Sequence, residues 1–160
     1  LANQLYLLLV IIVIYIFGLL LSRFLFGNGD MIVYGSEISV LEKSELLIRF
    51  TKAIALSYLS LTVISNLAFM LSSYMENSVA PIVITMVINI VFLIFGALTF
   101  EVFEPIQEVL FTKHMSLWNY CFELHPKFNE LYKSIGILLA YIGGFFVLAF
   151  YSFTKKDITQ

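Results

Sequence analysis

One cysteine and two histidines are the residue types in this chain best suited to chemistry. His114, Cys121 and His125 lie in one aromatic-rich segment, and imidazole and thiolate groups are common ligands of zinc and copper. Their spacing matches no ligand motif, so packing and surface positions are the simpler explanation. We therefore predict no metal site.

No sequence pattern in the chain supports catalysis. A nucleotide-binding loop of the GxxxxGK type would need its strand and helix to cradle phosphates, and the sequence contains none. The HExxH and GxSxG patterns are also absent from the sequence. We assign no catalytic residue and no cofactor to this chain and expect that it is not an enzyme.

Two amides lie inside otherwise apolar segments. Asn66 and Asn89 each need a hydrogen-bond partner, because an unpaired amide in hydrocarbon is costly. They either bond to neighbouring helices or line a wet substrate path. We favour interhelical hydrogen bonds, which are worth roughly 0.6 kcal/mol each.

Three acids follow the third apolar segment at helical spacing, with Pro105 among them. Glu101, Glu104 and Glu108 either receive a cationic substrate or solvate an exposed face. We favour solvation, since runs of charge usually mark a side of the molecule that faces water.

The composition excludes an ordinary soluble domain. Of the 160 residues, 61% are hydrophobic and 12% are charged, whereas soluble domains have roughly 45–50% and 25%. The net charge of -2 is close to balanced and argues neither for nucleic acid nor for a strongly basic lipid-binding surface. We expect no nucleic-acid partner. A single cysteine excludes an internal disulfide.

Four uncharged segments are long enough to cross a bilayer, which takes roughly 20 apolar residues. Pro81 lies near the start of the third segment, at a position where a first helical turn tolerates proline. The sequence therefore predicts an all-α, polytopic helical membrane protein, with residues 1–160 forming a single transmembrane domain. The predicted spans are approximately 5–22, 53–75, 78–100 and 134–154.

The connections between these segments differ in kind. The first contains the turn sequence GNGD and a capping box of Ser39 and Glu42, which predicts a short helix that continues into the second span. The second, SSYMENS, predicts a tight helical hairpin. The third is rich in aromatic residues and predicts an interfacial helical segment before the last span.

Small residues recur along one face of the last segment. Gly136, Ala140 and Gly144 are four residues apart and would allow another backbone to approach closely. They form either a dimer or gating interface or ordinary packing inside one bundle. We favour packing inside the bundle.

Three stretches have a recognisable order. The second span, the hairpin and the start of the third span lie in the stretch RFTKAIALSYLSLTVISNLAFMLSSYMENSVAPIVITMVI. The last span is preceded by LFTKHMSLWNY. The last stretch, near the end of the chain, is SIGILLAYIGGFFVLAFYSFTKKDI. This order resembles the permease subunit of type-2 ATP-binding cassette exporters, as typified by sodium, bacitracin and lantibiotic-immunity transporters. The resemblance implies spans three to six of a six-span permease, so we expect the chain to be the C-terminal part of a longer one.

The resemblance also implies function, partners and sites. It implies an exporter subunit of the bacterial cell membrane that forms a substrate pathway with a second permease copy. A separate ATPase subunit would carry ATP and magnesium, and a re-entrant segment would precede the last span. The implied pathway residues are Asn66, Asn89, Glu101 and Glu104; the implied ATPase contacts are Ser72, Ser73, Tyr74, Glu76, Asn77, Lys155 and Lys156.

Two alternatives remain open. The family pattern places the long connections outside the cell, whereas the positive-inside rule places them in the cytoplasm, because they carry most of the Lys and Arg residues. The chain could also be a non-transporting immunity or sensor protein that binds an extracellular peptide through its aromatic connection.

Overall fold

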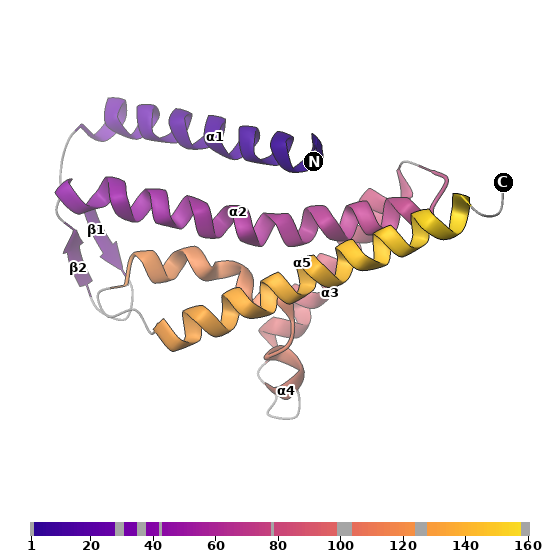
Figure 1. Cartoon of the computed structure of the whole chain (residues 1–160). Coiled ribbons are helices and arrows are strands. Elements are labelled where there is room, and N and C mark those ends of the chain that lie inside the picture. The colour runs from indigo at the N-terminus through magenta and orange to yellow at the C-terminus, as the bar shows by residue number, and fades with distance from the viewer. Residues whose placement is uncertain are drawn as a thin grey trace.

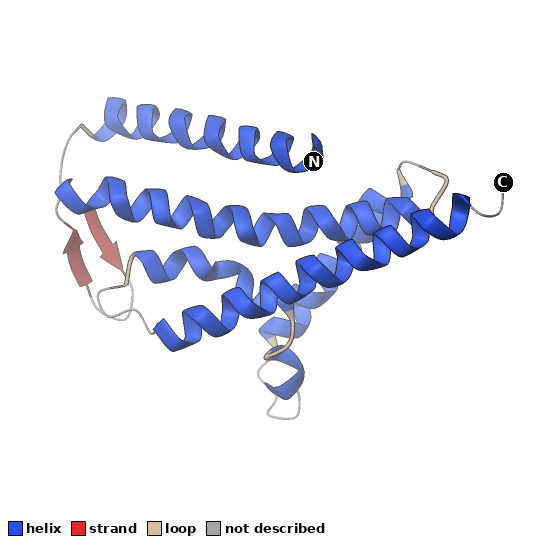
Figure 2. Cartoon of the chain, in the orientation of Figure 1, coloured by secondary structure: helices blue, strands red, loops and turns tan. Residues whose placement is uncertain are grey.

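A computed structural model describes residues 2–27, 31–34, 38–41, 43–77, 79–98, 104–123 and 128–157. Helices account for nearly all of this part of the chain (Figures 1 and 2). In chain order the elements are α1 (Ala2–Phe26), β1 (Met31–Tyr34), β2 (Ile38–Leu41), α2 (Lys43–Tyr74), α3 (Ala80–Ala97), α4 (Glu104–Gln107), the 3₁₀ helix η2 (Phe111–Cys121) and α5 (Phe128–Asp157).

Four of these helices, α1, α2, α3 and α5, are long and apolar enough to cross a membrane. Each overlaps one of the four predicted spans, so the prediction of a multi-pass helical membrane protein is confirmed. In an unsolvated hydrocarbon layer a helix pairs its own backbone groups, which explains why such apolar segments are helical.

Helices α2 and α5 are longer than the predicted spans. α2 begins ten residues before position 53, as the predicted continuous helix requires, and α5 begins six residues before position 134. Their first turns carry the charged residues Glu45 and Glu130. The uncharged part of α2, residues 53–74, is about 33 Å long, which matches a hydrocarbon core of about 30 Å.

Helix α3 is shorter than predicted. Its last helical residue is Ala97, and Leu98 is extended. The side-chain amide of Gln107 donates to the carbonyls of Phe95 and Leu98, at 3.0 and 2.6 Å. The carbonyl of Phe95 also accepts from the backbone N–H of Leu98, at 3.4 Å. The Gln107 side chain therefore ties α4 to the end of α3.

The first connection contains an antiparallel β-hairpin, which the sequence analysis missed. Ser39 pairs with Val33 in register, so it lies in a strand, and the predicted helix start at Ser39 is wrong. The helix begins at Lys43. The segment MIVY is rich in β-branched and aromatic residues that favour strands, and this signal outweighed the capping pattern.

Helices α2 and α5 form the central pair of the bundle, with their N-terminal ends at the same end of the molecule (Figure 1). η2 packs against both of them, while α3 packs against α2. The buried core joins α2, η2 and α5 and consists of Val63, Leu67, Phe111, Leu117 and Leu138.

η2 is the helical segment predicted before the last span, and one end of it enters the bundle. Phe111 is fully buried, and its ring lies 5.5 Å from Phe92 of α3 and 5.4 Å from Tyr141 of α5. Tyr141 lies about 12 Å along α5 from Lys133, the last charged residue before the uncharged part of that helix. This end of η2 therefore lies deeper than the charged helix ends.

Candidate functional site

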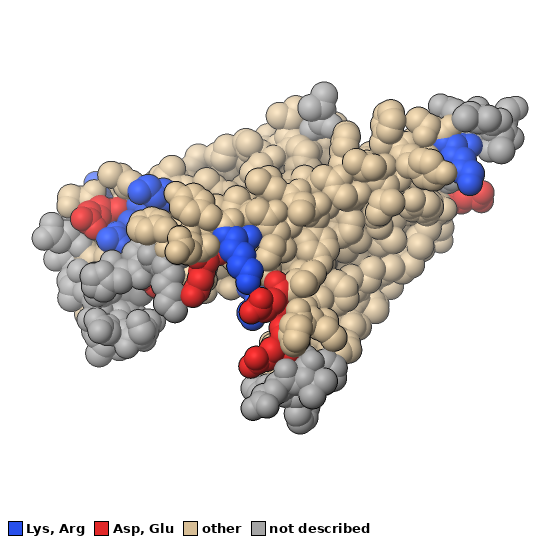
Figure 3. Space-filling model, turned by 60° about the horizontal axis from the view of Figure 1, so that its bottom comes forward, with Lys and Arg blue, Asp and Glu red and all other residues tan. Residues whose placement is uncertain are grey.

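Charge separates the molecule into two ends. Figure 3 shows a wide uncharged band between the charged groups at the left and centre and those at the right. The β-hairpin, η2 and the start of α5 lie toward one end and α4 projects from the lower middle of the view, whereas the turn between α2 and α3 and the C-terminal end of α5 lie at the other end (Figure 1). We call these the connection end and the hairpin end.

At the hairpin end, α2 and α5 are fastened together. The hydroxyl of Ser152 donates to the carbonyl of Ser73 at 3.2 Å, and the hydroxyl of Tyr74 donates to the carbonyl of Leu148 at 3.3 Å. The ring of Phe153 lies 5.8 Å from that of Phe69. The hairpin and the tail that the resemblance assigns to ATPase contact therefore form one surface.

Most of the residues assigned to that surface are accessible, with one exception. Ser73 is only 2% exposed and serves to hold α2 against α5, so it does not present its side chain to a partner. Lys156 lies in α5, but its side chain is outside the described part of the chain. The exposed members are Ser72, Tyr74, Glu76, Asn77 and Lys155.

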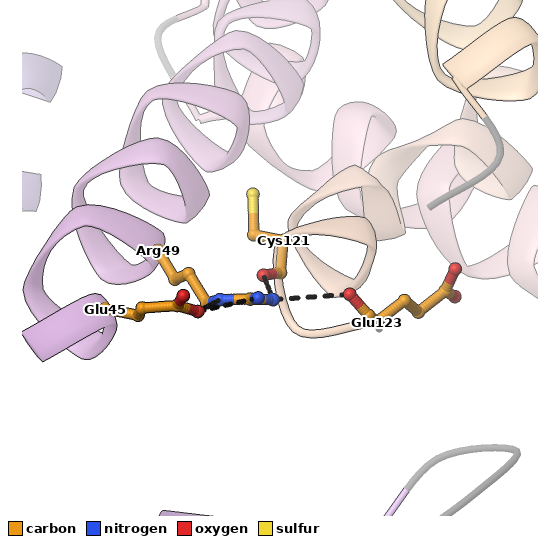
Figure 4. A network of polar contacts seen from close by, with 4 residues as sticks. All are labelled: Glu45, Arg49, Cys121 and Glu123. Atoms are coloured by element: carbon orange, nitrogen blue, oxygen red, sulfur yellow. Dashed lines mark hydrogen bonds and ion pairs between the residues drawn. The ribbon is translucent and has the colours of Figure 1, made fainter. Parts of the chain in front are cut away.

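At the connection end, Arg49 joins α2 to the end of η2 (Figure 4). Its guanidinium forms an ion pair with Glu45 at 3.0 Å and donates to the carbonyls of Cys121 and Glu123 at 3.1 and 3.3 Å. The ring of Phe122 packs on Phe50 beside this contact, at 5.1 Å. Arg49 therefore fixes the end of η2 against α2.

His114 makes a second junction at this end. Its Nε2 lies 2.9 Å from the carbonyl of Glu108 and its Nδ1 lies 2.8 Å from the hydroxyl of Ser134. A carbonyl only accepts, so Nε2 donates to Glu108, whereas the Ser134 hydroxyl fits Nδ1 as either donor or acceptor. A cavity of about 350 Å³ lies beside this junction, with Lys113, Tyr120 and other residues in its wall.

An ion pair reinforces the same junction from outside. The ammonium of Lys133 lies 2.9 Å from the carboxylate of Glu108. The hydrogen bond and charge of Lys133 lower the pKa of Glu108. Glu108 is thus held in its charged form, as a solvated acid paired with a lysine.

A larger cavity of about 420 Å³ lies between α2, the end of η2 and the start of α5. We call it the interface cavity. Its wall combines charged and apolar side chains and consists of Glu45, Ile48, Arg49, Lys52, Leu56, Tyr120, Cys121, Glu123, Phe128 and Leu131. Burial raises the pKa of the Cys121 thiol, and the positive charges of Lys52 and Arg49 oppose this shift.

Sequence reasoning did not identify the interface cavity. Glu45, Arg49 and Lys52 are spaced by four and three residues, which places them on one face of a helix. That spacing was a usable signal once α2 was known to begin at Lys43. What the sequence could not show is that Cys121 returns to this face across 72 residues.

The candidate metal ligands that the structure describes are not gathered into a site. His114 uses both ring nitrogens in hydrogen bonds within the protein, and His125 lies outside the described residues. Within the described ranges, no group of three His, Cys, Asp or Glu residues is placed to hold a metal ion.

The three predicted pathway residues that the structure describes have separate surroundings. Asn66 accepts a hydrogen bond from Gln4 of α1 at 2.8 Å, which is the interhelical bond the sequence predicts. Asn89 instead donates to the carbonyl of Thr85 in its own helix at 2.9 Å, so the expected interhelical bond of Asn89 is replaced by a local one. Glu104 is exposed in α4, and Glu101 lies outside the described residues.

The small-residue face of α5 points away from the bundle. Gly136, Ala140 and Gly144 are all exposed, and a Cβ added at either glycine would meet no atom within 4 Å. The sequence favoured packing of these small residues inside the bundle. Their exposure shows that packing within the described part of this chain does not explain the small-residue face.

The chain matches one protein family over nearly its whole length. The model of that family, described as a protein of unknown function (DUF2705), covers residues 1–159. The chain belongs to this family. No curated protein and no solved structure matches the chain.

Proposed function

We propose that this protein is the membrane-spanning permease subunit of an ATP-driven exporter of the type-2 ATP-binding cassette kind. One observation carries the proposal: the turn between α2 and α3 and the end of α5 are fastened into one exposed surface. This is the place where the family resemblance expects a separate ATPase subunit to dock.

The central helix pair offers a physical route from that surface to the opposite end. α2 has 32 residues and α5 has 30, so each is about 45 Å or more in length. Stiff elements of this length carry a displacement at the hairpin end to the cavities at the connection end. Nucleotide-driven movement of the partner would thereby alternate the access of a substrate path, in the manner of rocking bundles.

The proposal includes partners and a location. The ATPase subunit binds ATP and magnesium, and a second permease copy completes the pathway within a bacterial cell membrane. Pathway residues would be Asn66, Asn89, Glu101 and Glu104, of which Asn66 lies beside other polar side chains of α1 and α2.

The test is copurification with an ATPase subunit encoded beside this protein. We expect the tagged full chain to retain that subunit, and the charge reversals Glu76→Lys and Lys155→Glu to weaken retention roughly five- to tenfold, because both residues are exposed at the hairpin end. Lys113→Glu is the matched control, since Lys113 is an exposed lysine at the connection end. Equal loss in all three variants, or no retained ATPase at all, contradicts the proposal.

A second candidate is an immunity or sensor protein that binds an extracellular peptide without transport. The two cavities at the connection end, of about 420 and 350 Å³, favour it. Peptide binding that persists in the purified chain without any ATPase, together with a histidine kinase encoded nearby, would support the sensor over the exporter.

A further inference from the structure

The interface cavity has two chemically different sides. Ile48, Lys52 and Leu56 project at four-residue intervals from one face of α2, and Phe128 and Leu131 of α5 add apolar surface opposite them. The cavity thus offers apolar walls beside cationic groups, which is the pattern that suits an amphiphile with a negative head.

The two cations of the cavity differ in how they are held. Arg49 is fixed by Glu45 and by two carbonyls, so most of its hydrogen-bonding capacity is used. Lys52, in contrast, has no hydrogen bond or ion pair with any residue the structure describes, and it is exposed. The carboxylate of Glu123 points away from Arg49 (Figure 4). The two acids and two bases of the wall cancel in formal charge, but Glu45 is paired with Arg49, so Lys52 is the cation of this wall that is left to meet an anionic group.

The cavity lies at the depth of lipid headgroups. Lys52 is the last charged residue before the uncharged part of α2, and an ammonium at that position marks the boundary of the hydrocarbon. Trp118 and Tyr120 lie in the adjacent η2, with Trp118 45% exposed. Exposed tryptophan and tyrosine are typical of the membrane interface.

We propose that the interface cavity binds the anionic headgroup of a membrane phospholipid. The lipid phosphate lies against Lys52 and the outer edge of the Arg49 guanidinium, and an acyl chain follows Ile48, Leu56 and Leu131. The occupied leaflet is the one at the connection end. This inference does not require an ATPase partner, so it stands or falls separately from the proposed exporter.

The single tryptophan of the chain provides a direct measurement. Trp118 packs on Phe122 at 6.2 Å, and Phe122 packs on Phe50 beside the cavity, so bromine atoms on a lipid bound there quench its fluorescence. The full chain is reconstituted in phosphatidylcholine vesicles containing a fraction of brominated phosphatidylglycerol or, separately, the same fraction of brominated phosphatidylcholine. We expect stronger quenching by the anionic lipid at equal fractions.

Three variants locate the effect. Lys52→Gln should lower the relative affinity for phosphatidylglycerol about fivefold, because one lysine near an anionic surface contributes on that scale. Lys52→Arg keeps the charge and should retain the preference. Lys113→Gln removes the same charge from the same end but lies outside this cavity, so it should leave the preference unchanged.

The competing outcomes are distinct. Equal quenching by both brominated lipids, or the same loss in Lys113→Gln as in Lys52→Gln, overturns the proposal, because the site would then be absent or would reflect general surface charge. Inorganic phosphate should relieve quenching no more than sodium chloride at the same ionic strength. Relief specific to phosphate would instead assign the cavity to a soluble anion and would overturn the lipid assignment.

Discussion

At the residue scale, Arg49 is the side chain on which the connection end depends most. Five N–H groups in a planar fork allow one arginine to bond a carboxylate and two carbonyls at once, which a lysine does not reproduce. The residue is half-buried and connects α2 to residues 72 and 74 positions later in the chain. Arg49 therefore holds together two segments that are far apart in the sequence.

We predict that Arg49→Ala lowers the free energy of unfolding by about 1–3 kcal/mol, because it leaves two carbonyls without their donor. The measurement is reversible denaturation in mixed micelles. Glu45→Gln removes only an exposed ion pair within one helix turn and should cost less than about 0.5 kcal/mol. If both variants lower the free energy of unfolding by a similar amount, the hydrogen bonds from Arg49 to the two carbonyls do not contribute to stability.

At the element scale, α1 is the least embedded of the four candidate spanning helices. None of its membrane-spanning window is buried within this chain, and polar side chains near its N-terminal end hold it to α2. Asn3 donates to Ser65 at 2.7 Å and Gln4 donates to Asn66 at 2.8 Å. The hydrophobic effect does not drive helix association within the hydrocarbon of a membrane, so interhelical hydrogen bonds such as these contribute to it instead.

We predict a coupling free energy of roughly 0.6 kcal/mol between Gln4→Leu and Asn66→Leu in a double-mutant cycle on unfolding in mixed micelles. The matched control pairs Gln4→Leu with Asn89→Leu. Asn89 is also an amide in a spanning helix, but it bonds within α3, so its coupling to Gln4 should be near zero. Equal coupling in both cycles would argue that α1 is not held by the Asn66 contact.

At the scale of the whole molecule, the arrangement of ends is the property from which function follows. The hairpin between α2 and α3 lies with the end of α5, and η2 lies at the opposite end with the β-hairpin (Figure 1). This separation predicts that a membrane divides the two sets of residues.

We predict the sidedness of labelling by a membrane-impermeant maleimide in a Cys121→Ser background. Cysteines replacing the exposed Asn77 and Lys155 should react from one side, and a cysteine replacing the exposed Lys113 from the other. The family resemblance expects Lys113→Cys to react on intact cells. Reaction of Lys113→Cys only in inverted vesicles would support the positive-inside count instead, and reaction of Asn77→Cys and Lys113→Cys from the same side would contradict the fold.

The sequence by itself determined the four membrane helices, because hydrocarbon forces every backbone group in a long apolar segment to pair within its own helix. It also predicted the continuous second helix and a helical segment before the last span. Local patterns fixed these features. Ser39 shows the limit of such patterns, since a capping signal and a strand signal overlap there and pairing with β1 decided between them.

The tertiary structure alone decided which polar groups meet. Arg49 and Cys121, Gln4 and Asn66, and Ser73 and Ser152 are each separated by 62 residues or more, and no local period encodes such pairs. The tertiary structure also decided that Gly136, Ala140 and Gly144 face outward. A helix face is buried or exposed according to which other helices pack against it, and the local sequence does not specify that packing.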